Sequence, residues 1–224
     1  MISMGCPGED PFLEERVVRY DEWLRKGQIS FASRVVPVAA SLDARQWVLP
    51  SVQASEILQS ARAVALQNCE CRTHYQRCDR PIEVCFVLNE VADRAVARGE
   101  ARYVSLDEAV TVLEQASASG LVHMSLYMPD HQVYALCNCC ACCCHDLQIV
   151  RLYGRLDLMV RSEYVAVTDA GLCTGCGDCV ERCAFGARHL EAGRLAYDAG
   201  ACMGCGLCVT VCPLAATSLE PRPS

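Results

Sequence analysis

The spacing of apolar residues over the first half of the chain predicts a run of helices. In the segment "SVQASEILQSARAVALQN", Ile57, Ala61 and Val64 recur three or four positions apart, which places them on one helical face. Ser51 stands before this pattern as a candidate N-cap. The predicted helices span residues 11–27, 51–68, 79–99 and 105–120.

Capping residues reinforce the last of these helices. Ser105 and Glu108 form the S-x-x-E capping box, in which the side chain of each residue accepts a hydrogen bond from the backbone N–H of the other. Gly120 is in the position that ends a helix in the left-handed conformation. These signals are structural and carry no chemistry.

Alternation replaces helical spacing farther along the chain. Residues 121–128 ("LVHMSLYM") and 133–137 ("VYALC") are predicted as short strands around a Pro129–Asp130 turn. Residues 146–154 are predicted as a short helix and residues 155–170 as a linker, followed by a strand–turn–strand unit at 188–197. The fold class is therefore α+β: a mostly helical, Cys-rich module over residues 1–160, then a small α+β domain over residues 161–224.

Composition changes this picture through its cysteines. The chain has 19 cysteines in 224 residues and a formal charge of −7, which argues against a nucleic-acid-binding surface. No secretory signal and no apolar run of membrane-spanning length is present, so we expect a cytoplasmic protein without a membrane span. Because disulfides are disfavoured in that compartment, dense cysteine indicates metal or redox chemistry.

The strongest chemical signal is an internal repeat near the C-terminus. "LCTGCGDCVERCAFGA" at residues 172–187 matches "ACMGCGLCVTVCPLAA" at residues 201–216, and the offset is 201 − 172 = 29 residues. Each copy has the spacing C-x2-C-x2-C-x3-C, in which three closely spaced thiolates can cap three corners of a cubane. Glycines between the cysteines leave room for the backbone to wrap a cluster. Two structural zinc sites are the alternative, although zinc does not call for this triple spacing.

This repeat resembles the bacterial-type two-cluster ferredoxin domain over about residues 163–216. The resemblance implies a small pseudo-twofold α+β domain with two [4Fe-4S] clusters. It implies that one cluster is held by Cys173, Cys176, Cys179 and Cys212, and the other by Cys202, Cys205, Cys208 and Cys183. Ala184 stands where the family usually has proline, so we expect a looser loop after a retained ligand.

A second group of thiols lies in the middle of the chain. It comprises Cys69, Cys71, Cys78, Cys85, Cys137, Cys139, Cys140, Cys142, Cys143 and Cys144. From about residue 49 onward the chain resembles a group of ferredoxin-like 4Fe-4S binding proteins from anaerobes, which implies one or two further iron–sulfur clusters. All of these thiols except Cys144 are named as candidate metal ligands. Because neighbouring side chains of an extended backbone face opposite ways, the "CNCCACCC" loop must bend sharply or serve two faces.

Several interpretations of the middle thiols stay open at this point. They are a disulfide-rich knot, structural zinc with two cysteines from each burst, or iron–sulfur clusters with spare thiols. His145 and His74 are candidate ligands or hydrogen-bond donors, and Arg72 either offsets cluster charge or forms a surface salt bridge. Cys6 is predicted to be an unliganded thiol. Attachment of haem c is improbable because it needs C-x-x-C-H.

These observations predict an iron–sulfur electron-transfer protein or subunit that passes single electrons between redox partners. No G-x-G-x-x-G or P-loop motif accompanies the thiols, so a carrier or redox-enzyme subunit is favoured over a free-standing enzyme. The acidic chain suits a partner with a basic docking surface. The alternatives are an oxidoreductase that reduces a disulfide or small substrate at the middle thiols, and a non-redox scaffold with zinc there.

Overall fold

The computed structural model describes residues 10–36, 52–128 and 132–222. Three features from the sequence, Cys6, the Ser51 cap and the Pro129–Asp130 turn, lie outside the described residues. Among the residues that are described, no helix is both long and apolar enough to cross a lipid bilayer.

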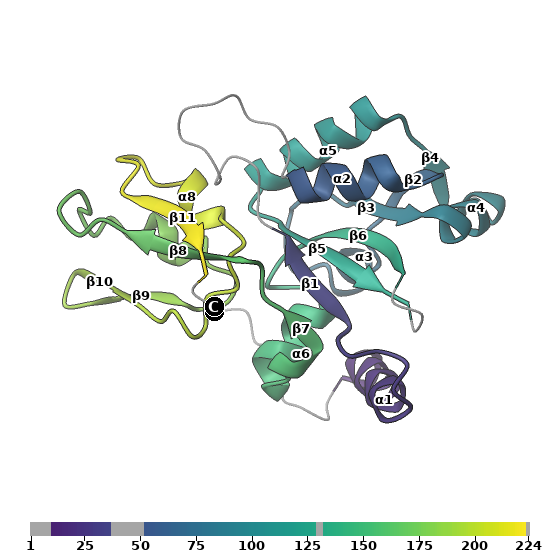
Figure 1. Ribbon diagram of the computed structural model, residues 1–224, viewed down its shortest axis with the longest axis horizontal. Helices are drawn as coiled ribbons and strands as arrows, with labels where there is room; N and C mark the ends of the chain where they lie inside the picture. The colour runs from purple at the N-terminus through teal and green to yellow at the C-terminus, as the bar shows by residue number, and fades with distance from the viewer. Residues whose placement is uncertain (1–9, 37–51, 129–131, 223–224) are drawn as a thin grey trace.

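A seven-stranded mixed sheet forms the centre of the N-terminal module (Figure 1). Its order is β4-β2-β3-β6-β5-β1-β7, and every neighbouring pair is antiparallel except β1 and β7. The strands are β1 (Ser33–Val36), β2 (Val64–Asn68), β3 (Glu83–Leu88), β4 (Ala101–Tyr103), β5 (Val122–Tyr127), β6 (Val133–Cys139) and β7 (Met159–Val160).

The prediction of a mostly helical module is not confirmed, because two segments predicted as single helices each contain a strand. Residues 51–68 divide into a helix and β2, and residues 79–99 divide into β3 and a helix. Val84, Phe86 and their neighbours in β3 are buried on both faces of the sheet. A continuous apolar run of this kind lacks the alternation of a half-buried strand, so its pattern cannot be distinguished from that of a buried helix. The predicted linker is also wrong in part, since β7 joins the sheet edge beside β1.

The remaining helix and strand predictions in the module are confirmed. Ser105 caps the predicted helix, with its Oγ accepting from the Glu108 N–H at 3.2 Å, and β5 and β6 pair as the predicted strands. Asp10 caps the first helix in the same way through Phe12 and Leu13. The helices are α1 (Pro11–Arg25), α2 (Val52–Ser60), α3 (Glu70–Tyr75), α4 (Asn89–Ala97), α5 (Leu106–Ala118) and α6 (His145–Tyr153), with the 3₁₀ turn η2 (Leu156–Leu158) after them.

The two faces of the sheet carry different residues. Val84, Phe86 and Leu136 pack on one face against α2 and α5, which lie side by side in Figure 1. Val87 and Ala135 pack on the other face with residues of α4. Because side chains of a strand alternate, the cysteines of these two strands, Cys85, Cys137 and Cys139, all lie at odd positions and on the same face as Val87 and Ala135.

The C-terminal unit is a small pseudo-twofold α+β structure. Its strands are β8 (Tyr164–Thr168), β9 (Arg188–Glu191), β10 (Arg194–Tyr197) and β11 (Thr217–Pro221), and its short helices are α7 (Asp178–Glu181) and α8 (Leu207–Thr210). Strand β8 pairs with β11 and β9 pairs with β10, and both pairs are antiparallel. The second pair confirms the strand–turn–strand unit predicted at residues 188–197. The 29-residue repeat relates these pairs: Asp169 accepts from the Gly171 N–H and Asp198 from the Gly200 N–H, each at 2.7 Å.

The two units share a hydrophobic cluster. Met124 and Leu147 of the N-terminal module are buried together with Met203 and Leu207 of the C-terminal unit. A hydrogen bond also crosses the boundary, since the Arg182 guanidinium donates to the Ala118 carbonyl at 3.4 Å. Burial of this apolar surface holds the thiols of the two units in one continuous structure.

Candidate metal centres

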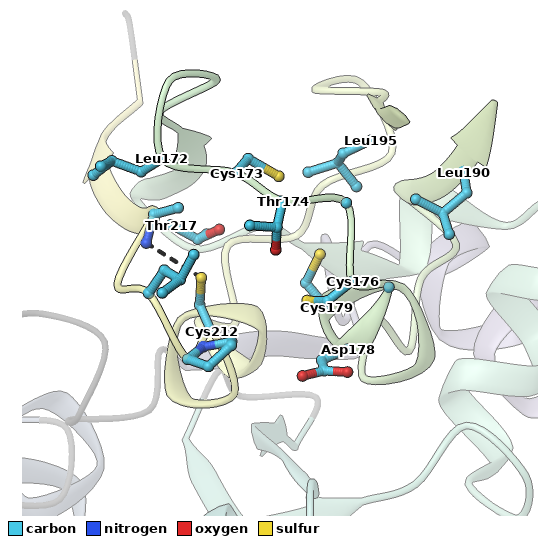
Figure 2. Close-up of a pocket in the computed structure, with 15 residues that line it drawn as sticks. Leu172, Cys173, Thr174, Cys176, Asp178, Cys179, Leu190, Leu195, Cys212 and Thr217 are labelled. Carbon is cyan, nitrogen blue, oxygen red and sulfur yellow. Dashed lines mark hydrogen bonds between the residues drawn. The ribbon is translucent and has the colours of Figure 1, made fainter. Parts of the chain in front are cut away.

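The outer pocket of the C-terminal unit is lined by four cysteines (Figure 2): Cys173, Cys176, Cys179 and Cys212. Cys173 and Cys176 belong to the loop that enters α7, Cys179 lies in α7 itself, and Cys212 comes from the segment after α8. Cys176 is exposed, whereas Leu190 and Leu195 provide an apolar wall. The Ala216 N–H donates to Cys212 Sγ at 3.2 Å, the kind of contact that stabilises a thiolate.

The inner pocket repeats this arrangement on the side facing the N-terminal module. It is lined by Cys183, Cys202, Cys205 and Cys208. Burial raises the pKa of the Cys205 thiol and raises that of Cys208 to about 11. A bare thiolate is therefore disfavoured in this pocket, and a bound cation would reverse that preference because a coordinating thiol loses its proton.

Two glycines allow the cysteine loops to close. Gly175 and Gly204 occupy equivalent places in the repeat and have φ of 70° and 71°. A Cβ on Gly175 would lie 2.5 Å from the Gly193 carbonyl oxygen, and one on Gly204 would collide with Ser162 Oγ and the Tyr164 carbonyl oxygen. The glycine between the first two cysteines of each loop is thus required by both conformation and space.

A buried arginine lies between the two pockets. Arg188 is 3% exposed, lines the inner pocket and donates through its NH1 to Cys179 Sγ of the outer pocket at 3.7 Å. Burial opposes the charged guanidinium, yet the nearby thiolates of Cys208 and Cys179 raise its pKa. Thr168 Oγ1 accepts a second bond from the same nitrogen at 2.9 Å. The residue supplies a fixed positive charge to both thiol sets.

Residues 166–214 match the 4Fe-4S dicluster domain family. The match covers the repeat and both pockets, so the donor chemistry of the pockets and the family agree: eight thiols in two sets suit two iron–sulfur clusters. No curated protein matches the chain.

Six of the middle thiols form a ring around one pocket of the N-terminal module. This six-thiol ring consists, in order of contact, of Cys69, Cys71, Cys144, Cys139, Cys137 and Cys85. The ring closes because Cys85 contacts Cys69. Its members come from the start of α3, from β3, from β6 and from the N-terminus of α6.

Hydrogen bonding alternates around the ring. Bonds donated by neighbouring thiols lower the pKa of every second member, and the donors have raised pKa values for the same reason. The lowered pKa values are those of Cys69, Cys137 and Cys144, and the raised ones are those of Cys71, Cys85 and Cys139. Thiols of lowered and raised pKa thus alternate around the pocket, because each hydrogen bond favours the thiolate form of its acceptor and the protonated form of its donor.

Polar side chains surround the ring on the side of α1 and α6. His145 Nδ1 lies 3.3 Å from Cys71 Sγ and 3.2 Å from an Arg16 guanidinium nitrogen, and burial lowers the pKa of His145 to about 4. Burial raises the pKa of Asp146 to about 7, and the Tyr20 hydroxyl donates to its Oδ1 at 2.8 Å. His145 is thus a neutral hydrogen-bonding neighbour of the ring.

The other four middle thiols gather in a separate, compact set on the opposite side of β6. This four-thiol site consists of Cys78, Cys140, Cys142 and Cys143. Cys140 follows Cys139 directly, so the two neighbours serve different sites, and the turn at residues 141–143 then bends the chain. Both possibilities raised for the "CNCCACCC" loop therefore occur: it bends sharply and it serves two faces.

Arg72 is the second buried arginine among the thiols. It is 2% exposed and donates to the Asn138 carbonyl at 2.9 Å and to Cys140 Sγ at 3.6 Å. Burial opposes its charge, while the thiolates of Cys69 and Cys140 raise its pKa. The prediction that Arg72 offsets charge at the thiols is supported by these contacts, and the alternative of a surface salt bridge is wrong because the side chain is buried.

Sequence reasoning omitted one thiol and left another contact open. Cys144 was not among the candidate ligands, yet it joins the ring between Cys71 and Cys139. Its position before α6 was visible in the sequence, but the strand register that brings it to Cys71 was not.

His74 stacks on Phe12 with ring centroids 4.0 Å apart. All eighteen cysteines in the described part of the chain are free thiols, so no disulfide knot is observed there.

Proposed function

We propose that the protein is an iron–sulfur electron-transfer protein or subunit with two [4Fe-4S] clusters in its C-terminal unit. The ligands are Cys173, Cys176, Cys179 and Cys212 in the outer pocket, and Cys202, Cys205, Cys208 and Cys183 in the inner pocket. The observation that carries this proposal is the match to a 4Fe-4S dicluster domain over the two pockets, each lined by four thiols. Each cluster would accept or release one electron at a time.

The two pockets differ in their exposure to solvent, which suggests a path for electrons through the molecule. Cys176 of the outer pocket is exposed, whereas Cys205 of the inner pocket is 9% exposed and shares a hydrophobic cluster with Cys139 and Cys144 of the six-thiol ring. An external partner would exchange electrons at the outer pocket. The inner pocket would connect it to the ring.

The six-thiol ring is proposed to hold a further iron–sulfur cluster. Four thiolates are enough for one cubane, and the ring places six sulfur atoms around one pocket. Arg72 lies next to Cys69 of the ring, and Arg16 borders the same pocket, so two cations offset the negative charge of the thiolates. Such a cluster would supply a third one-electron site, and these residues would set its electrostatic surroundings.

The partner is proposed to be a redox protein with a basic docking surface, in the cytoplasm. Asp178 lines the outer pocket (Figure 2), and Glu181 follows it in α7, so the helix that begins at this pocket carries two acidic residues. Charges of this kind steer encounter and depend on ionic strength.

Metal analysis of the full chain, prepared without oxygen, tests the proposal. Two cubanes require about eight irons and eight sulfides per chain, and a cluster in the ring raises both numbers to about twelve. The dithionite-reduced protein is then mixed with a basic haem protein, and electron transfer is followed by the haem spectrum. We expect transfer that slows as salt is added. Colourless protein without sulfide would overturn the proposal.

A second candidate function is reduction of a disulfide or small substrate at the ring. It is favoured by a specific observation, since the ring has two thiols more than a cubane requires and has His145 and Asp146 against it. The electrons and protons would come from an external donor and from water. Turnover of a disulfide by the reduced protein, lost in Cys71→Ser and retained in Cys176→Ser, would favour this function over simple transfer.

A further inference from the structure

The four-thiol site is far more compact than the pockets of the C-terminal unit. The sulfur atoms of Cys78, Cys140, Cys142 and Cys143 all lie within 4.8 Å of one another. Cys78 Sγ is 3.9 Å from Cys140 Sγ, and Cys142 Sγ is 3.9 Å from Cys143 Sγ. Cys140 and Cys143 are buried, and Cys78 and Cys142 are partly buried.

This spacing suits one ion and not a cluster. Four thiolates at 2.3 Å from a zinc ion, arranged as a tetrahedron, stand about 3.8 Å apart. In a [4Fe-4S] cubane each thiolate binds a different iron at a corner, so the ligand sulfurs stand farther apart than around one ion. The 3.9 Å separations therefore match a single tetrahedral centre.

Two arginines supply the charge that such a centre needs. Four thiolates and one divalent ion carry a net charge of −2, since the ion offsets only two of the four negative charges. Arg72 NH1 donates to Cys140 Sγ and Arg80 NH1 donates to Cys142 Sγ, each at 3.6 Å. Arg72 is 2% exposed, and its Nε and NH2 have no other hydrogen-bond partner in the described part of the chain. A buried, incompletely paired cation at this place calls for a stable negative group beside it.

The backbone of the thiol turn is also held in place. Arg77 NH1 donates to the Cys142 carbonyl at 3.4 Å and to Gln148 Oε1 at 2.9 Å. Gln148 in turn donates to the Cys143 carbonyl at 3.0 Å. These bonds orient the two neighbouring cysteines before any metal binds, as outer contacts of a metal site commonly do.

We propose that Cys78, Cys140, Cys142 and Cys143 form a closed zinc site that is separate from the iron–sulfur centres. The site has four thiolates and no position for substrate, which is the pattern of structural zinc. One ligand comes from the loop after α3 and three come from the turn after β6, not two from each burst as the zinc alternative supposed. The ion ties these segments together and holds Cys139 and Cys144 at the ring on the far side of the turn.

The first test uses the unaltered full chain, prepared without oxygen after growth with both iron and zinc. Elemental analysis is expected to give one zinc per chain alongside the iron. X-ray absorption at the zinc edge is expected to show four sulfurs at about 2.3 Å and no nitrogen or oxygen ligand. Absence of zinc, or a single iron bound by this site, would overturn the proposal.

A pair of matched variants then locates the ion. The double variant Cys78→Ser/Cys142→Ser is expected to lose the zinc and keep the sulfide and iron of the C-terminal unit. The control Cys173→Ser/Cys176→Ser is expected to lose about four irons and keep the zinc. Loss of iron and sulfide together with retention of zinc in the first variant would instead assign a cluster to these four thiols. The iron content of the control reports on the proposed function separately, so the two proposals fail independently.

Discussion

The N-terminal module and the C-terminal unit bring their cysteines together in different ways. Each holds two sets of thiols, and each places one buried arginine in contact with a thiol: Arg188 with Cys179, and Arg72 with Cys140. In the C-terminal unit three cysteines of each set lie within seven consecutive residues, and only the fourth comes from the other repeat. In the module the six-thiol ring is assembled from α3, β3, β6 and α6, which are distant in the chain, whereas the four-thiol site takes three cysteines from one turn and Cys78 from the loop after α3.

The difference shows how much of a metal site can be local. A loop with glycines at positive φ presents three thiols to one place whatever surrounds it, as Gly175 and Gly204 do. In the module, Cys137 and Cys139 of β6 belong to the six-thiol ring and Cys140, the residue after β6, belongs to the four-thiol site, so the thiols divide into two sites where this strand ends. Changes in the first unit should therefore act on one cluster, and changes in the second should act on the fold as well.

The largest expected effect is the loss of one cluster from the C-terminal unit. Replacing Cys205 by Ser removes a ligand from the inner pocket, and we expect about four irons and four sulfides fewer per chain. Iron and sulfide assays of oxygen-free protein measure this. The control Cys6→Ser lies outside both repeats and should leave the metal content unchanged. Loss of all iron from Cys205→Ser would mean that the two pockets do not bind independently.

The next effect concerns the two buried arginines. Arg72→Met leaves the thiolates around Cys140 without their buried cation, and we expect unfolding to become easier by about 3 kcal/mol. Arg188→Met removes the cation that contacts Cys179. Because Cys173, Cys176 and Cys179 are close together in the chain, we expect this variant to keep its stability and to change mainly the reduction potentials of the proposed clusters. Thermal unfolding and redox titration of both variants give the comparison. Equal stability losses in the two variants would contradict the distinction between the units.

Glycine substitutions probe the local loops alone. Gly204→Ala is expected to destabilise more than Gly186→Ala, although both glycines have φ near 70°. A Cβ on Gly186 meets nothing within 4 Å. Only the left-handed backbone conformation then lowers the stability of Gly186→Ala, by about 1 kcal/mol. At Gly204 the Cβ also strikes Ser162 and Tyr164. Chemical unfolding with the iron content measured in parallel checks the order, and a larger loss in Gly186→Ala would contradict it.

The smallest expected effect is confined to the scaffold. Ser105→Ala removes the side chain that caps α5 and should cost about 1 kcal/mol of stability without changing iron, sulfide or zinc content. Ser105→Asp retains an acceptor and should recover most of the loss. Chemical unfolding measures both variants. A change in metal content of Ser105→Ala would show that α5 does more than cover the sheet.

Prediction from the sequence succeeded where the signal was short in range. The Ser105 cap, the hairpin at residues 188–197 and the strands β5 and β6 follow from neighbouring residues and are confirmed. The segments containing β2 and β3 were assigned to helices, because residues buried on both faces of a sheet show no alternation. The sequence left the division of the middle thiols open, because that division depends on the pairing of β6 with β3, a strand that the sequence assigned to a helix.

The sequence alone determined that the chain has two repeated cysteine motifs and the glycines that let each loop turn, because these contacts are separated by a few residues. Only the tertiary structure decided that ten middle thiols divide into a ring of six and a compact set of four. It also decided that Arg72 is buried among them. The physical reason is that Cys139, the last residue of β6, and Cys140, the residue after it, serve different sites, and the partners of each are brought there by the long-range pairing of β3 with β6.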